Sequence, residues 1–149
     1  MRPPRTLLIT GGGIGIGRAS ALAFGQAGWH VVVTDILEAE GRAVAAQIVA
    51  AGGSASFAAL DVRSTEQADA VVAAVLSERG AIDALVLNAG IARKVPLAQL
   101  SDERWDDTVD IDLKGMFRVA RAALPSMRAR RAGAVVCLTS LMGVAWGWT

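Results

Sequence analysis

A glycine-rich segment between an apolar run and a helical pattern restricts the fold of this chain most strongly. Residues Thr10 to Gly17 read Thr-Gly-Gly-Gly-Ile-Gly-Ile-Gly, directly after the apolar run Thr6–Ile9. A strand that feeds such a loop into a helix presents backbone N–H groups and the positive end of the helix dipole to an anion. Glycine is required there because a Cβ would block close approach and disfavour positive φ values. The segment predicts a phosphate-binding turn, and the alternative is a tight strand-to-helix turn without a ligand.

Short apolar runs alternate with longer helical patterns along the 149 residues. The expected strands are Thr6–Thr10, His30–Thr34, Ser56–Leu60, Ala84–Leu87 and Ala134–Thr139. The expected helices are Gly15–Ala27, Glu38–Ala51, Ser64–Arg79 and Asp102–Arg130, with a kink at Pro125. The strands are continuously apolar, which is typical of parallel strands covered on both faces. This order predicts an α/β fold in which one domain, residues 1–149, contains an open parallel sheet.

Composition excludes several classes of protein. The chain is 53% hydrophobic and 19% charged with a net charge of +1, so we expect a globular protein that does not bind nucleic acid. No apolar run is long enough for a membrane span, and Met1–Arg5 lacks the apolar core of a signal peptide, which favours a cytoplasmic location. The only cysteine, Cys137, lies in an apolar run and is expected to be buried. The only histidine, His30, has no second ligand in view, so no metal site is expected.

An acidic residue closes the second expected strand. Asp35 stands 18 residues beyond Gly17, and its carboxylate can accept hydrogen bonds from both hydroxyls of an adenosine ribose. The same charge would repel a 2′-phosphate, and the next residue, Ile36, is not a cation that could pair with one. This pair of residues favours NAD over NADP. The alternative is that Asp35 caps the helix that starts near Glu38.

Polar residues also follow the third and fourth expected strands. Asp61-Val62 comes after the third strand, and Asn88-Ala89-Gly90 comes after the fourth. Each segment alone is a common turn sequence. Ligands bind at the carboxyl ends of parallel strands, so together with the glycine loop these segments predict one shared crevice.

The combination resembles the short-chain dehydrogenase/reductase family. The matching segments are Thr10-Gly11-x-x-x-Gly15-Ile16-Gly17, Asp35, Asp61-Val62, Asn88-Ala89-Gly90, Asp112–Phe117 and Thr139–Gly143, so the resemblance extends over the whole chain. It implies a Rossmann-like, doubly wound parallel sheet. It also implies an NAD-dependent oxidoreductase that transfers hydride between the nicotinamide and a secondary alcohol or ketone.

The resemblance also implies roles for individual residues. The residues expected at the cofactor are Gly11, Gly13, Ile14, Gly15, Ile16 and Gly17 for the phosphates, Asp35 and Ile36 for the adenosine ribose, Asp61 and Val62 for adenine, and Asn88, Ala89 and Gly90 for the ribose region. Ser140 matches the catalytic serine, whose hydroxyl polarises the substrate oxygen. Asp112 stands where the family usually has an asparagine that helps to hold a water of the proton relay.

The chain contains no tyrosine, whereas the family's acid/base is the tyrosine of a Tyr-x-x-x-Lys helix. Counted from Ser140, that tyrosine would fall just past residue 149. The resemblance therefore implies the first part of such an enzyme, truncated and inactive alone, with an uncovered fifth strand. The full-length form is expected to be a homo-oligomer, either a dimer or a tetramer. The alternative is a non-catalytic dinucleotide-binding or interaction protein derived from such an enzyme.

Overall fold

The computed structural model describes residues 4–92 and 95–140, and in this part the centre of the fold is a parallel sheet. Its strands are β1 (Thr6–Thr10), β2 (His30–Asp35), β3 (Ser54–Ala59), β4 (Ala84–Leu87) and β5 (Ala134–Cys137). They pair in the order β3-β2-β1-β4-β5. This order confirms the predicted Rossmann-like, doubly wound α/β fold.

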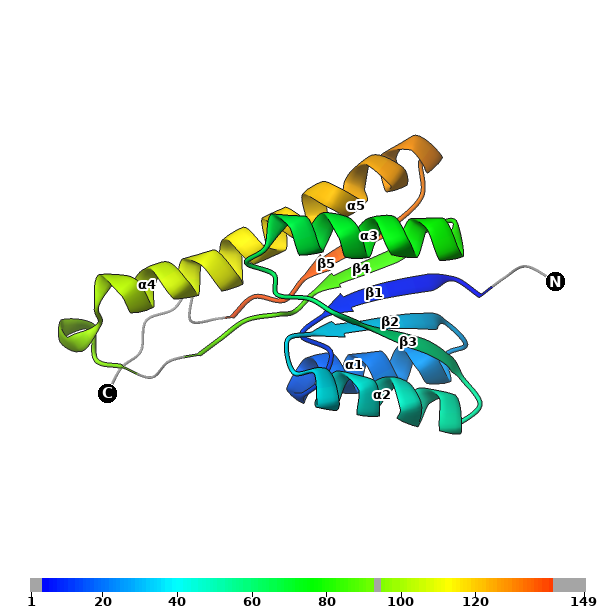
Figure 1. The fold of residues 1–149 in the computed structure, drawn as a ribbon, viewed down its shortest axis with the longest axis horizontal. Coiled ribbons are helices and arrows are strands. Elements are labelled where there is room, and N and C mark those ends of the chain that lie inside the picture. The colour runs from blue at the N-terminus through cyan, green and yellow to red at the C-terminus, as the bar shows by residue number, and fades with distance from the viewer. Residues whose placement is uncertain (1–3, 93–94, 141–149) are drawn as a thin grey trace.

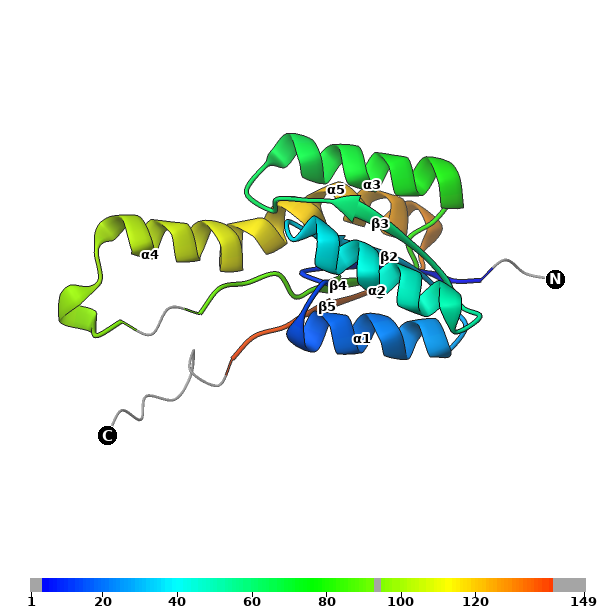
Figure 2. The ribbon, with the colours of Figure 1, turned by 60° about the horizontal axis from the view of Figure 1, so that its bottom comes forward.

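Helices cover both faces of the sheet (Figures 1 and 2). On one side lie α1 (Gly15–Gln26) and α2 (Glu38–Ala50), and on the other lie α3 (Thr65–Arg79) and α5 (Met116–Arg130). Successive residues of a strand point to opposite faces, so Leu7 and Ile9 join the core beside α1 and α2, whereas Leu8 joins the core beside α3 and α5. The continuous apolar run of β1 is explained by this burial on both sides.

Several helix ends carry a serine cap or a glycine with positive φ. The Ser64 hydroxyl accepts a hydrogen bond from the Gln67 N–H at 3.1 Å and caps α3. Gly28 and Gly52, with φ of +80° and +84°, follow the ends of α1 and α2 as expected for C-terminal glycines.

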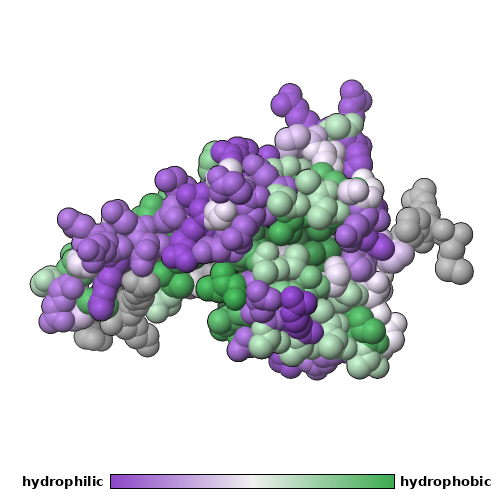
Figure 3. Space-filling view, in the orientation of Figure 1, coloured by the Kyte–Doolittle hydropathy of each residue, from purple (hydrophilic) through white to green (hydrophobic). Residues whose placement is uncertain are grey.

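The segment predicted as one helix, Asp102–Arg130, is helical throughout but is not a single α-helix. The segment divides into α4 (Asp102–Thr108), a π-helical stretch η2 (Val109–Gly115) and α5, which includes Pro125 and continues to Arg130. A short 3₁₀ turn, η1 (Leu97–Gln99), precedes α4. Helix α4 extends beyond the carboxyl edge of the sheet (Figure 1). This extension presents a largely hydrophilic surface on the side drawn in Figure 3.

β5 forms one edge of the sheet, as expected, and its residues are exposed. Cys137 is therefore an exposed free thiol, and the expectation that it is buried is wrong. Its strand pairs with β4 on one side, while the described residues place no strand on the other. Among the described helices, none has the length and apolar character needed to cross a bilayer.

His30 begins β2, and both of its ring nitrogens face the neighbouring strand. Its Nδ1 lies 2.7 Å from the Ser54 hydroxyl and its Nε2 lies 3.3 Å from the Ser56 hydroxyl. The histidine thus joins β2 to β3 by side-chain contacts away from the carboxyl edge.

Candidate functional site

A cleft of about 530 Å³ lies at the carboxyl edge of the sheet. β1 and β4 are neighbours in the sheet at this point. The chain continues from β1 to β2 on one side of this pair and from β4 to β5 on the other side. Such a topological switch point is where open α/β sheets bind ligands. The lining contains ten of the residues predicted for the cofactor: Gly11, Ile14, Ile16, Asp35, Ile36, Asp61, Val62, Asn88, Ala89 and Gly90.

The glycine loop is fastened to the end of β4. Gly11 has φ of +61°, and the Asn88 side-chain amide donates to the carbonyls of Thr10 at 3.0 Å and Gly11 at 2.9 Å. A Cβ at Gly17 would overlap the Gly11 carbonyl and lie 2.5 Å from Asn88 Nδ2. Gly17 therefore allows the first turn of α1 to pack closely against the glycine loop and Asn88.

The start of α1 is open. Its N-cap residue, Ile14, makes no side-chain hydrogen bond, in contrast to the serine caps of α3 and α4. The N–H groups of a first helical turn have no partner within the helix, so an anion can accept hydrogen bonds from them. Ile14, Gly15 and Ile16 are exposed, which leaves this approach clear.

Asp35 is only 7% exposed, and its two oxygens have different partners. Oδ2 accepts a hydrogen bond from the Gly13 N–H at 2.9 Å, and Oδ1 accepts one from the Leu37 N–H at 3.0 Å. The carboxylate therefore supports the start of α2 and also fixes the glycine loop. Each oxygen of an ionised carboxylate has a second acceptor site, so a ribose hydroxyl could still donate to Asp35. Ile36 beside it is 63% exposed.

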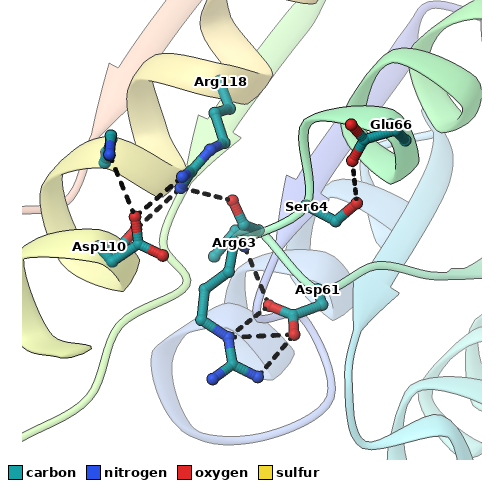
Figure 4. A network of polar contacts seen from close by, with 8 residues as sticks. Asp61, Arg63, Ser64, Glu66, Asp110 and Arg118 are labelled. Atoms are coloured by element: carbon teal, nitrogen blue, oxygen red, sulfur yellow. Dashed lines mark hydrogen bonds and ion pairs between the residues drawn. The ribbon is translucent and has the colours of Figure 1, made fainter.

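A charged network holds the loop after β3 (Figure 4). The Arg63 side chain donates to both Asp61 oxygens, the shortest distance being 2.7 Å from Nη2 to Oδ2. These hydrogen bonds are the main reason why the pKa of Asp61 is lowered, which keeps the carboxylate ionised. From α5, Arg118 donates to the Val62 carbonyl and to Asp110.

Asp112 lies in the middle of η2, next to the lining residues Gly90 and Ile91. Its Oδ1 accepts a hydrogen bond from the Ile91 N–H at 2.8 Å. Burial raises the pKa of the Asp112 carboxyl, and the bond from Ile91 opposes this rise. A π-helical stretch often marks a functional site, and this one surrounds Asp112.

The predicted catalytic pair is not in the lining of the cleft. The described lining residues include neither Asp112 nor Ser140. Ser140 is exposed beyond the end of β5, and the rest of the predicted segment that begins at Thr139, residues 141–143, lies outside the described residues. The structure thus brings together ten of the residues predicted for the cofactor, and neither predicted catalytic residue is among the described lining residues.

Sequence reasoning missed several residues of this region. The additional lining residues are Leu37, Leu60, Arg63, Ile91 and Ile111. All five directly adjoin predicted residues. Extending each strand-end segment by one position would have found Leu37, Leu60, Arg63 and Ile91, and Ile111 directly precedes Asp112. No local signal indicates Arg118, because its contact with the loop after β3 depends on the packing of η2 and α5.

Comparisons with known proteins agree with this architecture. A family model described as short chain dehydrogenase matches residues 5–148. The 3-oxoacyl-[acyl-carrier-protein] reductase FabG of Staphylococcus aureus is 35% identical over 144 residues, which are 96% of this chain and 58% of that enzyme.

Two solved structures extend the comparison. The crystal structure of gox2181 has a TM-score of 0.93 and 31% identity, and the match covers 98% of this chain and 57% of that protein. A metagenomic short-chain oxidoreductase in complex with NADP has a TM-score of 0.84 and 35% identity, with 88% and 60% covered. The chain thus spans little more than half the length of these relatives.

Proposed function

Since this chain belongs to the short-chain dehydrogenase/reductase family of oxidoreductases, we propose that its cleft binds NAD for hydride transfer with a secondary alcohol or ketone. The observation that carries the proposal is the fastening of the glycine loop by Asn88 at the switch point between β1 and β4. Residues 1–149 would serve as one dinucleotide-binding domain.

The phosphate end of the cleft fits a dinucleotide. The uncapped start of α1 offers backbone N–H groups at Gly15 and Ile16, and Gly11 leaves room for close approach. Gly13 and Gly17 would hold this cradle in shape through their contacts with Asp35 and Gly11. A diphosphate is the ligand group that such a helix start favours.

The adenosine end determines which cofactor is preferred. Asp35 would accept hydrogen bonds from the ribose hydroxyls, and Ile36 would cover the sugar without offering a charge to a 2′-phosphate. Asp61 would accept from the exocyclic amino group of adenine, while the Val62 N–H would donate to the adjacent ring nitrogen. A similar solved structure contains NADP, so the choice has to be measured in this chain.

At the reaction end, a bound nicotinamide would supply the carbon that accepts or donates hydride. Ser140 would orient the substrate oxygen by a hydrogen bond, and Asp112 would hold the backbone beside the cleft through Ile91. The chain contains no tyrosine to move the proton, so we expect no turnover at an enzymatic rate from these residues alone.

A second candidate is a non-catalytic dinucleotide-binding protein. The carboxylate of Asp112 in place of the usual asparagine favours it. Reading the coding sequence past residue 149 separates the two candidates, because a Tyr-x-x-x-Lys pattern shortly afterwards supports the enzyme. The enzyme would act on a small-molecule alcohol or ketone, whereas the non-catalytic protein would need no substrate.

Calorimetric titration with NAD and NADP tests the proposed cofactor. We expect the unaltered chain to bind NAD at least about tenfold more tightly than NADP, because the buried Asp35 carboxylate repels a 2′-phosphate. Asp35→Asn removes the charge and keeps an acceptor oxygen for one of the two backbone N–H groups, so its affinity for NADP relative to NAD should rise by about tenfold.

The matched control is Asp69→Asn, which removes an exposed charge on α3 and should leave both affinities unchanged. Equal binding of NAD and NADP by the unaltered chain would show that Asp35 does not select the cofactor. A folded chain that binds neither dinucleotide would remove the proposed function.

A further inference from the structure

A side chain from α5 holds the loop that follows β3 (Figure 4). Arg118 Nη1 donates to the carbonyls of Val62 at 3.4 Å and Asp110 at 3.2 Å, and its Nη2 donates to Asp110 Oδ1 at 2.8 Å. The Arg118 side chain is only 12% exposed. A buried guanidinium needs such partners, so its position is fixed by Asp110 on one side and by the loop on the other.

The peptide between Val62 and Arg63 is held at both of its polar atoms. Its carbonyl accepts from Arg118, and its N–H donates to Asp61 Oδ1 at 2.9 Å. The preceding peptide is held at its oxygen, because the Asp61 carbonyl accepts from the Ser64 N–H at 2.9 Å. In a trans peptide the N–H lies opposite the carbonyl, so the Val62 N–H points away from this turn.

The Val62 N–H makes no hydrogen bond to any of the described residues, and Val62 lines the cleft. A backbone N–H in a largely buried residue normally has a partner, so a free one at a cleft marks a place for a ligand acceptor. The ionised Asp61 carboxylate next to it is an acceptor. The loop therefore presents one donor and one acceptor side by side.

Helix packing transmits the position of η2 to this loop. A Cβ at Gly115 would lie 2.7 Å from Val62 Cγ2 and 2.9 Å from Val62 Cβ, so η2 packs against Val62 with no room for a side chain. Arg118, one turn after Gly115, also contacts Val62, through the hydrogen bond to its carbonyl. The hydrogen bond from Arg118 and the packing of Gly115 together fix the position of the Val62 backbone.

Adenine and hypoxanthine differ in what they offer to such a loop. Adenine has an exocyclic amino donor beside a ring-nitrogen acceptor, whereas hypoxanthine has an oxygen acceptor beside a ring N–H donor. We propose that Arg118 is a positioning residue that aligns the Val62 N–H and thereby sets the preference of the site for adenine over hypoxanthine, an inference that rests on the proposed binding of NAD.

The test compares NAD with deamino-NAD, in which hypoxanthine replaces adenine, by calorimetric titration of the chain. The unaltered chain should bind NAD about tenfold more tightly than deamino-NAD. In Arg118→Lys the ammonium can keep the ion pair with Asp110 but lacks the second N–H that reaches the Val62 carbonyl. The preference of this variant for NAD over deamino-NAD should fall to about threefold or less, while its melting temperature stays close to that of the unaltered chain.

Arg121→Lys is the matched control, since Arg121 lies on the same helix with its guanidinium over the Phe117 ring at 5.3 Å. Its affinity ratio should equal that of the unaltered chain. Arg118→Met is a second variant, which removes both the hydrogen bond to Val62 and the charge. Its preference for NAD over deamino-NAD should fall in the same way even if its affinity for both ligands drops.

The possible outcomes are distinguishable. An unaltered ratio in Arg118→Lys, or an equal loss for both ligands in both Arg118 variants, would overturn the inference because it would show a merely structural role. The inference also fails if the unaltered chain binds NAD without preferring it to deamino-NAD. A folded chain that binds neither ligand rejects the proposed function itself.

Discussion

Asp112 is a residue whose charge state couples to the stability of the fold. Burial raises the pKa of its carboxyl above the ordinary value of 3.8. A pKa that is higher in the folded state than in the unfolded state stabilises the fold at low pH, and this contribution is lost as the pH rises through the folded-state value. At neutral pH the ionised carboxylate therefore carries the cost of its burial.

We predict that Asp112→Asn unfolds at a higher temperature than the unaltered chain at neutral pH, by about 2 °C. Asparagine keeps an acceptor for the Ile91 N–H and does not ionise, so the gain should shrink as the pH falls toward about 4. Thermal unfolding followed by circular dichroism over this range measures it. Asp106→Asn, an exposed change on α4, should show no such trend, and a gain that is independent of pH would contradict the explanation.

Individual residues differed in how well the sequence predicted them. Asp35, Asp61 and Asn88 were placed correctly at the cleft because each follows a strand, and the carboxyl ends of parallel strands share one edge. Arg118 could not be found in this way, since it contacts Val62 across a sequence separation of 56 residues. Cys137 was misplaced because an apolar run indicates a strand without indicating whether both of its sides are covered.

At the scale of elements, the junction of β1 and α1 depends on a glycine contact. Gly17→Ala would place a methyl group against the Gly11 carbonyl and Asn88, so α1 or the loop would have to shift. We predict a loss of about 2 kcal/mol or more in the free energy of unfolding and a marked loss of NAD affinity. Urea unfolding and calorimetry measure the two effects.

Gly28→Ala is the comparison for that variant. Gly28 has φ of +80° and open space around its missing Cβ, so the change should cost about 1 kcal/mol through backbone strain alone. Its affinity for NAD should stay unchanged. If Gly28→Ala weakens NAD binding as much as Gly17→Ala does, the effect comes from general destabilisation.

The elements themselves were predictable where pattern and packing agree. β1 and β4 match their expected bounds because both are buried on both faces between strong turn signals. The stretch Val109–Gly115 was missed because the prediction assumed the α-helical period throughout, whereas the i→i+5 pairing of a π-helix changes that period. What distinguishes it is a shift in backbone pairing, which composition does not reveal.

At the scale of the whole molecule, α5 exposes an apolar surface. Phe117 is 57% exposed and Leu124 is 47% exposed, and both line a groove along the helix. Exposed apolar surface of this kind marks contact sites between proteins, in line with the expected homo-oligomer.

We predict that the chain associates with itself through this face and that Leu124→Asp shifts it toward the monomer, by about tenfold in the dissociation constant. Sedimentation velocity over a range of concentrations measures the shift. Leu97→Asp alters a leucine that is 71% exposed in η1, away from α5, and should leave association unchanged. Equal effects of both variants would assign the association to general surface hydrophobicity.

The position of Cys137 gives this molecule an intrinsic reporter. The chain has one sulfhydryl group, and it sits on β5, one of the two edge strands of the sheet in the described residues. Alkylation kinetics would therefore follow the accessibility of a single, known location without any engineered label. A polypeptide that binds along β5 would cover Cys137 and slow its alkylation. The alkylation rate would therefore report that binding.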